Sequence, residues 1–193
     1  MFAKPKPVLG GRGVTLVELA VTLSVLTILS LIAAPTFSDH IQRARIRAAA
    51  EALTDLFVLS RSEAIKRGSE VSVTTAGTPR SWCAGASDAG AKEPGAMAGP
   101  AAACDCSAAA ACVVGDERLV VDGTDFRDVT LANIGGTVTF DGKHGTLSNL
   151  VPTTFHLAVA DRYRLRVAVG ATGVSSTCVP VADAPISGIP PCP

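Results

Sequence analysis

The sequence is poor in aromatic residues and carries no net charge. Among its 193 residues there are one Trp, one Tyr and six Phe, against 18 Gly and 12 Pro. A core must therefore be built from Val, Leu and Ile, and it will be small. The 17 basic and 17 acidic residues balance. This balance argues against a general nucleic-acid binder, which relies on excess positive charge.

Patterns typical of catalysis or metal binding are also missing from the sequence. The three histidines, His40, His144 and His156, are scattered and have no metal-ligand spacing. The serines in Ser60-Arg61-Ser62 fall on a predicted helix surface rather than in a nucleophile motif, and no phosphate-cradling glycine loop is found. We therefore expect a protein that is not an enzyme and that holds no cofactor and no metal.

One apolar run dominates the N-terminal part of the chain. Residues 14–34 contain a single charge, Glu18, and are enough to span a bilayer core of about 30 Å as a helix. The preceding segment, 1–13, carries Lys4, Lys6 and Arg12 and no acid, so the positive-inside rule keeps it cytoplasmic.

Two simpler interpretations of this run fit less well. A secretory signal peptide has a shorter apolar region of roughly 7–15 residues, and Pro35 is a poor residue to follow a cleavage site. A plain membrane anchor leaves Glu18 unexplained, because a charge in hydrocarbon is costly and usually functional. Thr15, Glu18 and Thr22 share one helix face by their spacing, which favours a partner helix over lipid on that face.

The stretch Gly13-Val14-Thr15-Leu16-Val17-Glu18-Leu19, followed by Pro35, resembles the N-terminus of type IV pilins and type II secretion pseudopilins. The resemblance implies cleavage after Gly13 by a prepilin peptidase and N-methylation of Val14. The usual first mature residue in the family is phenylalanine, so valine is a departure. The resemblance also implies an inner-membrane precursor with a periplasmic head, which packs its helix into a filament of minor and major pilin or pseudopilin subunits. The filament-assembly residues would be Thr15, Glu18, Leu19 and Pro35.

Glu18 has a physical role in such a filament. Cleavage would create a free α-amine at Val14, near the membrane interior. Glu18 of an incoming subunit can pair with the amine of a neighbour, because leaving either charge unpaired in low dielectric costs several kcal/mol. The pair would therefore set the axial register. Removal of the leader takes three of the 17 basic residues, so 14 remain against 17 acidic residues and the mature chain carries −3.

Six cysteines follow the apolar run, on the side of the membrane where disulfides form, and six cysteines allow 15 pairings. We expect Cys178 to pair with Cys192, in a loop that would resemble the C-terminal disulfide loop of many pilins. We expect Cys83, Cys104, Cys106 and Cys112 to form two more bridges among themselves. A zinc cluster of these four is the alternative, but an oxidising compartment argues against it.

Residues 36–67 predict an amphipathic continuation of the helix. Its apolar stripe is expected at Ile41, Ala44, Ala48, Ala52, Leu56 and Leu59. Gly68 suits the residue after the helix end, and Pro35 should kink the helix or remove a backbone hydrogen bond. Arg43, Arg45 and Arg47 are expected to contact lipid phosphates or acidic groups of neighbouring subunits.

The remainder, 68–193, predicts a β-rich head and, with the helix, an α+β pilin-like fold. Strands are expected at 71–74, 118–121, 126–134, 136–140, 154–160, 163–169 and 174–179, and 75–112 should be an Ala/Gly/Cys-rich loop. We expect antiparallel pairing in two small sheets packed on the helix. The segments 138–142 and 163–167 resemble the GspH/FimT branch of minor pilins and minor pseudopilins.

The sequence thus predicts a minor type IV pilin-like subunit, with a minor pseudopilin of type II secretion as the alternative. A DNA-binding competence pilin is a further alternative, because some FimT-like pilins bind DNA through a Gly-Arg-x-Arg segment near the C-terminus. The corresponding place here reads Gly173-Val174-Ser175-Ser176, and no basic residue follows Arg166. Arg162, Arg164 and Arg166 remain weak candidates, so nucleic acid is not an expected partner.

Overall fold

The computed structural model describes residues 13–88, 104–106, 108, 111–160 and 162–193, without the side chains of residues 33–36. The predicted leader apart from Gly13, residues 89–103 of the predicted loop, and the side chain of Pro35 therefore lie outside the described part. The chain divides into two compact units, Met1–His40 and Ile41–Pro193.

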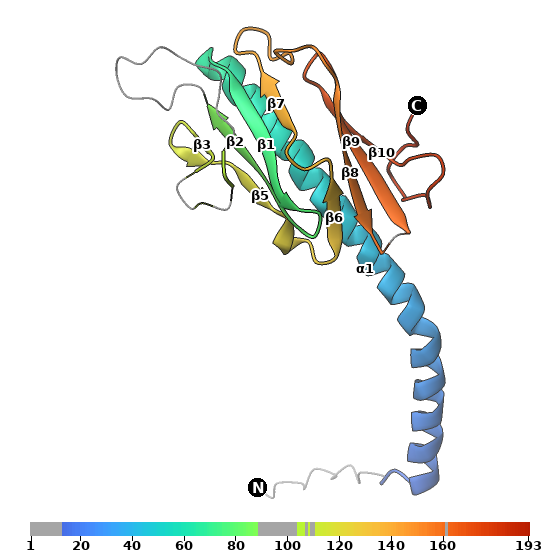
Figure 1. Cartoon of the computed structure of the whole chain (residues 1–193). Helices are drawn as coiled ribbons and strands as arrows, with labels where there is room; N and C mark the ends of the chain where they lie inside the picture. Colours follow the sequence, from blue (N-terminus) through green and yellow to red (C-terminus); the bar gives the residue numbers. More distant parts are fainter. Residues whose placement is uncertain (1–12, 89–103, 107, 109–110, 161) are drawn as a thin grey trace, which may run out of the picture. The chain divides into compact units, whose positions relative to one another are not determined.

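A single helix, α1 (Leu16–Arg67), runs through both units (Figure 1). It is continuous across Pro35, so the proline does not end the helix. Gly68 follows in the left-handed region at φ 63°. The Gly68 and Ser69 amides donate to the carbonyls of Ile65 and Ala64, both at 3.3 Å. This pairing is a Schellman C-cap, and it explains why the helix ends where the sequence predicted.

The second unit contains two four-stranded antiparallel sheets, as predicted. The first has the order β5-β2-β1-β7 and the second the order β10-β9-β8-β6. The first sheet is built from β1 (Val71–Thr78), β2 (Ser81–Asp88), β5 (Val120–Asp122) and β7 (Thr137–Phe140). The second is built from β6 (Val129–Ala132), β8 (Thr153–Val159), β9 (Tyr163–Val169) and β10 (Ser175–Cys178). A hairpin of β3 (Val113–Val114) and β4 (Glu117–Arg118) and the short helix η1 (Gly123–Asp125) complete the head.

The second half of α1 packs against both sheets (Figure 1), but the predicted stripe is mostly wrong. Of its six residues only Leu56 is buried, whereas Ala44, Ala48 and Leu59 are exposed. The stripe was misplaced because alanines make several faces of this helix apolar, so spacing alone does not single one out. Phe57 instead selects the buried face by stacking on Phe155, with ring centroids 5.3 Å apart. The buried residues are Ile46, Ala49, Ala50, Leu53, Leu56, Phe57, Ser60 and Ala64.

The predicted loop 75–112 is wrong over its first part. Residues 75–88 complete β1 and form β2, which lies inside its sheet between β1 and β5. Alanine, glycine and serine have weak strand preference, so little in this segment's composition indicates a strand. Trp82, Ala84 and Ala86 of β2 point into the core, and the Trp82 indole N–H donates to the Val129 carbonyl at 3.1 Å. Tertiary packing therefore sets this strand.

The predicted strand 126–134 is also too long. Only β6 (Val129–Ala132) forms, because the backbone takes positive φ at Asp128 (66°) and Asn133 (65°) on either side of it. Residues of these types tolerate the left-handed region. The strands expected at 154–160, 163–169 and 174–179 correspond to β8, β9 and β10.

Candidate functional site

The bond between Gly13 and Val14 lies in non-helical backbone ahead of α1. A Cβ placed on Gly13 would have no neighbour within 4 Å, and Val14 is 69% exposed. The fold of this chain therefore does not require glycine at position 13.

Thr15 directly precedes α1 and caps its N-terminus. Its hydroxyl accepts the Glu18 amide N–H at 3.2 Å, which satisfies one of the free amides of the first turn. Thr-x-x-Glu is the spacing of a capping box, in which the glutamate would return a bond to the threonine amide. Among the described residues the Glu18 carboxylate makes no such bond. Thr15 thus explains the helix start, and Glu18 is left with its charge unpaired.

The other polar side chains of this segment are satisfied within the helix. Their hydroxyls donate to carbonyls three or four residues earlier, at distances of 2.8 to 2.9 Å, in Thr22, Ser24, Thr27 and Ser30. Such bonds let hydroxyls sit in an apolar environment. Within residues 16–32, Glu18 is therefore the polar side chain that has no hydrogen-bond partner among the described residues.

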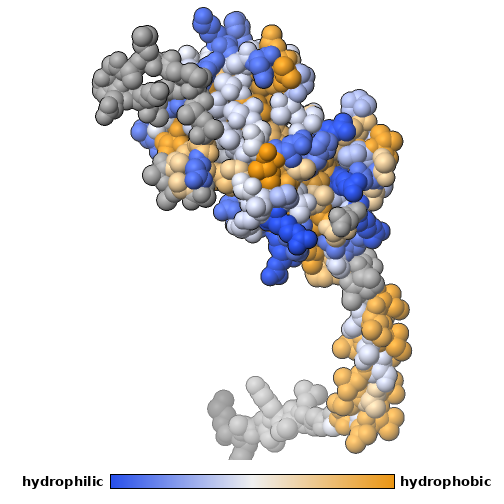
Figure 2. Space-filling view, in the orientation of Figure 1, coloured by the Kyte–Doolittle hydropathy of each residue, from blue (hydrophilic) through white to orange (hydrophobic). Residues whose placement is uncertain are grey.

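The apolar side chains around Glu18 are exposed. Figure 2 shows this part of α1 as an almost continuous apolar surface, and its large aliphatic side chains are all more than half exposed. Helix α1 is long and apolar enough to cross a membrane. Thr15 caps the helix from the position before it, and Leu16 and Leu19 lie in the first turn with Glu18, so the predicted assembly residues other than Pro35 form one exposed helix start.

The arginines early in the second unit contact the head of their own chain. The Arg43 Nε donates to the buried Tyr163 hydroxyl at 2.9 Å, and its guanidinium lies 5.1 Å from the centroid of that ring. Arg45 pairs with Asp128 at 3.1 Å, and Arg47 donates to the Ser187 carbonyl. These contacts within the chain were not predicted from the sequence, and the expected contact of the arginines with lipid or neighbouring subunits stays a prediction. Their spacing gave no sign of partners more than 80 residues away.

Two of the three arginines weighed for DNA binding contact other side chains of the head. Arg162 lies 5.4 Å from the Tyr163 ring centroid, and Arg164 pairs with Asp183 at 3.5 Å. Arg166 is half-buried, and its Nε is buried without a hydrogen-bond partner among the described residues. Arg164 and Arg166 point away from the core, as the strand alternation predicted. The structure does not gather the three into an open basic groove.

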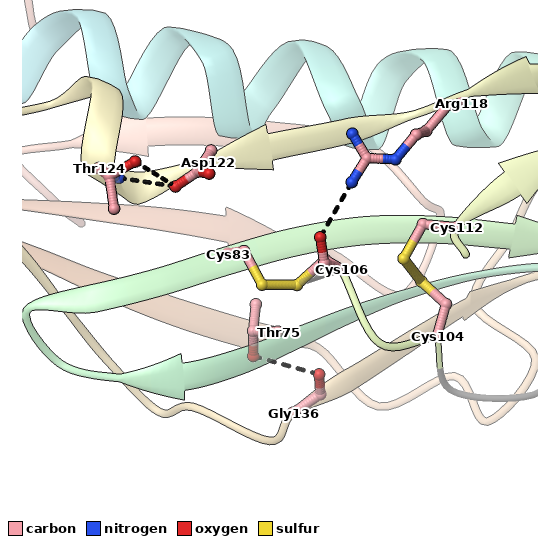
Figure 3. Close-up of a disulfide and its surroundings, with 9 residues drawn as sticks. All are labelled: Thr75, Cys83, Cys104, Cys106, Cys112, Arg118, Asp122, Thr124 and Gly136. Atoms are coloured by element: carbon pink, nitrogen blue, oxygen red, sulfur yellow. Dashed lines mark hydrogen bonds between the residues drawn. A yellow bond between two sulfur atoms is a disulfide. The ribbon is translucent and has the colours of Figure 1, made fainter. Parts of the chain in front are cut away.

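All six cysteines form disulfides. Cys178 is joined to Cys192, and the other pairs are Cys83 with Cys106 and Cys104 with Cys112. Figure 3 shows the last two pairs beside β2, where the Arg118 side chain donates to the Cys106 carbonyl at 3.0 Å. The pairing among these four could not be chosen from the sequence. In the structure their sulfurs are bonded to one another, so they are not available as thiolate ligands.

The shifted pKa values of Glu63 and Asp141 mark structural contacts rather than a reaction centre. Hydrogen bonds from Arg67 and Lys66 lower the pKa of Glu63. Backbone amides of His144 and Lys143 lower the pKa of Asp141 in the turn between β7 and β8. Both carboxylates are solvent-accessible, and both hold local structure at the end of the head where α1 stops.

Comparison with known proteins gives a matching family and two similar crystal structures of the same protein. The family described as "Type II transport protein GspH" matches residues 49–173. Two crystal forms of the type IV minor pilin FimU of Pseudomonas aeruginosa are similar at 19% identity. They cover 77% and 72% of this chain and 95% and 96% of FimU, with TM-scores of 0.45 and 0.44. No curated protein matches the chain.

Proposed function

Because the chain belongs to the GspH family of type II transport proteins, we propose that it is a minor pilin-like subunit of a periplasmic filament. It is made as an inner-membrane precursor with a cytoplasmic leader. A prepilin peptidase cleaves it after Gly13 and the new N-terminus at Val14 is methylated. The subunit then joins other minor and major pilin or pseudopilin subunits through α1. Its role is structural, without catalysis or a cofactor.

The observation that carries this proposal is the unpaired carboxylate of Glu18 in an otherwise self-satisfied apolar helix. Every hydroxyl in residues 16–32 is bonded to its own helix, and the side chains of this segment are exposed. An unpaired charge in hydrocarbon costs several kcal/mol. A cation supplied by a neighbouring subunit removes that cost, and the α-amine created at Val14 is such a cation.

Replacement of Glu18 tests the assembly role. In the producing cell, the Glu18→Ala variant should reach the membrane and be processed, yet be absent from sheared filaments. The matched control is Thr22→Val on the same helix face, whose hydroxyl bonds only to the Leu19 carbonyl, and which should assemble normally. Recovery of Glu18→Ala in filaments at the wild-type level would contradict the assembly role.

The N-terminal mass of the membrane-extracted protein tests processing. Wild type should begin at methylated Val14, and Gly13→Asp should retain the leader. Because a Cβ at position 13 has no neighbour within 4 Å among the described residues, a loss of cleavage would report on the peptidase rather than on misfolding. An unprocessed wild-type chain would instead identify a simple membrane-anchored domain.

A deletion strain separates the two kinds of filament. The family description names type II transport, which favours a pseudopilus, whereas the N-terminal motif fits a pilus equally well. Lost surface pili with a normal secreted-protein profile would assign the subunit to a type IV pilus. Normal pili with stalled secretion would assign it to a type II secretion pseudopilus.

A further inference from the structure

One arginine of the head lacks the acceptor that comparable arginines have. Five arginines of the described chain are half-buried, and four of them donate a hydrogen bond to a distant part of the head: Arg43, Arg45, Arg47 and Arg61. The fifth is Arg166 of β9, which makes no hydrogen bond or ion pair with a described residue and whose Nε is buried. The aliphatic stem of an arginine can cover apolar surface, but this packing does not supply the missing acceptor.

Arg166 lies beside a second polar side chain that has no partner. Leu165 and Val167 are buried in the core, so Arg166 lies on the outer face of the second sheet. His156 of β8 is directly opposite Arg166 in the pairing of β8 with β9 (Figure 1), and such residues are neighbours on one face. The half-buried His156 ring makes no hydrogen bond with the described residues, although an imidazole carries an N–H in either tautomer. We call His156 and Arg166 the donor pair.

The side chains around the donor pair provide it with no acid. On the other side of Arg166, the residue opposite is Cys178 of β10. Cys178 is bonded to Cys192, so a disulfide rather than a carboxylate lies there. Two residues earlier on the same face of β9, Arg164 pairs with Asp183 at 3.5 Å. The chain therefore supplies a carboxylate to Arg164 and none to Arg166.

The chemistry of the donor pair fits a single carboxylate. A guanidinium holds its N–H groups in a fork that matches the two oxygens of a carboxylate, and hydrogen bonds between charged groups are stronger than neutral ones. The two Nη atoms of Arg166 are not among the buried atoms that lack a partner, so an incoming group can reach them. A polyanion fits less well, because the Asp183 carboxylate at Arg164 would repel it and because nucleic acid is held by many phosphate contacts.

We propose that the donor pair binds an aspartate or glutamate side chain of a second protein on the outer face of the second sheet. That protein is a neighbouring filament subunit, a statement that rests on the proposed function. The other face of this sheet packs on α1, so the contact is made by the head without the helix. A subunit that brings no acid to this point would leave both donors unpaired, and the donor pair therefore selects among possible neighbours.

A crosslink without a spacer tests for the carboxylate directly. A carbodiimide joins a lysine amine to a carboxylate in contact with it. Membranes from cells that produce full-length Arg166→Lys are treated with this reagent, and the joined peptides are identified by mass spectrometry. Arg166→Lys should be joined to an aspartate or glutamate of another filament subunit, at severalfold higher yield than Thr172→Lys, an exposed control in the turn between β9 and β10. Arg164→Lys is the reaction control and should be joined to Asp183 of its own chain.

A second variant keeps the test decisive if Arg166→Lys alters the fold. His156→Lys probes the same contact from β8, and the fluorescence of the buried Trp82 shows whether each variant is folded. Yields for Arg166→Lys and His156→Lys no higher than for Thr172→Lys would overturn the donor pair. Binding of the wild-type chain to duplex DNA that is lost in Arg166→Gln would replace the acidic side chain by a phosphate.

The partner and the processing are tested in the same samples. A crosslink only to an acid of a protein that is not a filament subunit would overturn the proposed partner. A processed Val14 terminus in the absence of the crosslink refutes the donor pair alone, whereas an unprocessed terminus refutes the proposed processing. The two proposals can therefore fail separately.

Discussion

Removal of the disulfide between Cys178 and Cys192 should destabilise the head by an amount that its loop length predicts. The two cysteines are separated by 14 residues. In the chain-entropy description, a bridge that closes a loop of this size contributes about 3 kcal/mol, because it restricts the unfolded chain. For a unit of this size, such a loss lowers the melting temperature by roughly 6–12 °C.

The loop between Cys178 and Cys192 should keep its folded structure without the disulfide. We therefore expect the loss of stability to arise from greater freedom of the unfolded chain. The Cys192 amide donates to the Val179 carbonyl at 2.8 Å, and Val179 donates to Pro190 at 2.9 Å. Ile186 is buried in the core, and Arg164 pairs with Asp183 of the loop. These contacts hold the loop closed in the folded protein.

The assay is thermal unfolding of the processed full-length chain in detergent, followed by fluorescence of the single tryptophan. Trp82 is 1% exposed and reports core unfolding. A Cys178→Ser/Cys192→Ser variant is compared with wild type and with Ser176→Ala, an exposed change on β10 that should have no effect. An unchanged melting temperature in the double variant would refute the loop-closure argument. Loss of the folded spectrum at all temperatures would also refute it, since the loop would then be essential to the native fold.

Three further predictions concern the head. A Cβ at Gly85 would overlap the Cys112 sulfur. Gly85→Ala should therefore hinder the disulfide between Cys104 and Cys112 and leave titratable thiols after purification. Gly136→Ala is the control, because its Cβ would have its nearest atom at 3.5 Å, and it should leave no titratable thiols. Tyr163→Phe removes the acceptor of the Arg43 bond and should lower the free energy of unfolding by about 1 kcal/mol, and an unchanged value in denaturant titration would count against that bond. The pKa of Asp141 is lowered in the folded state. The ionised carboxylate therefore stabilises the fold at pH values above the pKa of an unfolded-state Asp, about 3.9. This stabilisation is lost as the pH falls through the lowered pKa of the folded state. Asp141→Ala should therefore reduce the melting temperature at pH 7 and have less effect at the acid end, and a pH-independent difference would contradict the assignment.

The parts of the fold that the sequence predicted are those with a strong local pattern. Large apolar residues occupy every second position from Phe155 to Val159 in β8 and from Tyr163 to Val169 in β9, and these positions are the buried ones. The end of α1 is encoded by Lys66, Arg67 and Gly68. In both cases a few neighbouring residues determine the structure, so no distant contact is needed to predict it.

The missed parts depend on contacts between distant residues. Strand β2 is composed mostly of small residues and becomes a strand because Trp82 packs in the core across from β6. The buried face of α1 is chosen by Phe57 against Phe155, almost 100 residues away. The arginines of α1 similarly find partners at Asp128, Tyr163 and Ser187. None of these pairs leaves a periodic trace in the sequence.

The two units are stabilised in different ways, and this difference bears on the role proposed for the Glu18 carboxylate. The head buries a contiguous core of its own and is held by three disulfides. The apolar part of α1 satisfies its backbone and hydroxyls internally, so it is stable in lipid without a partner. Since lipid is as apolar as Val or Leu, burial against another helix gives little hydrophobic gain. In the proposed filament, close packing would supply attraction at many positions along such a helix, whereas Glu18 would supply it at only one. A charge at one level of the helix would therefore distinguish a single axial position from all the others.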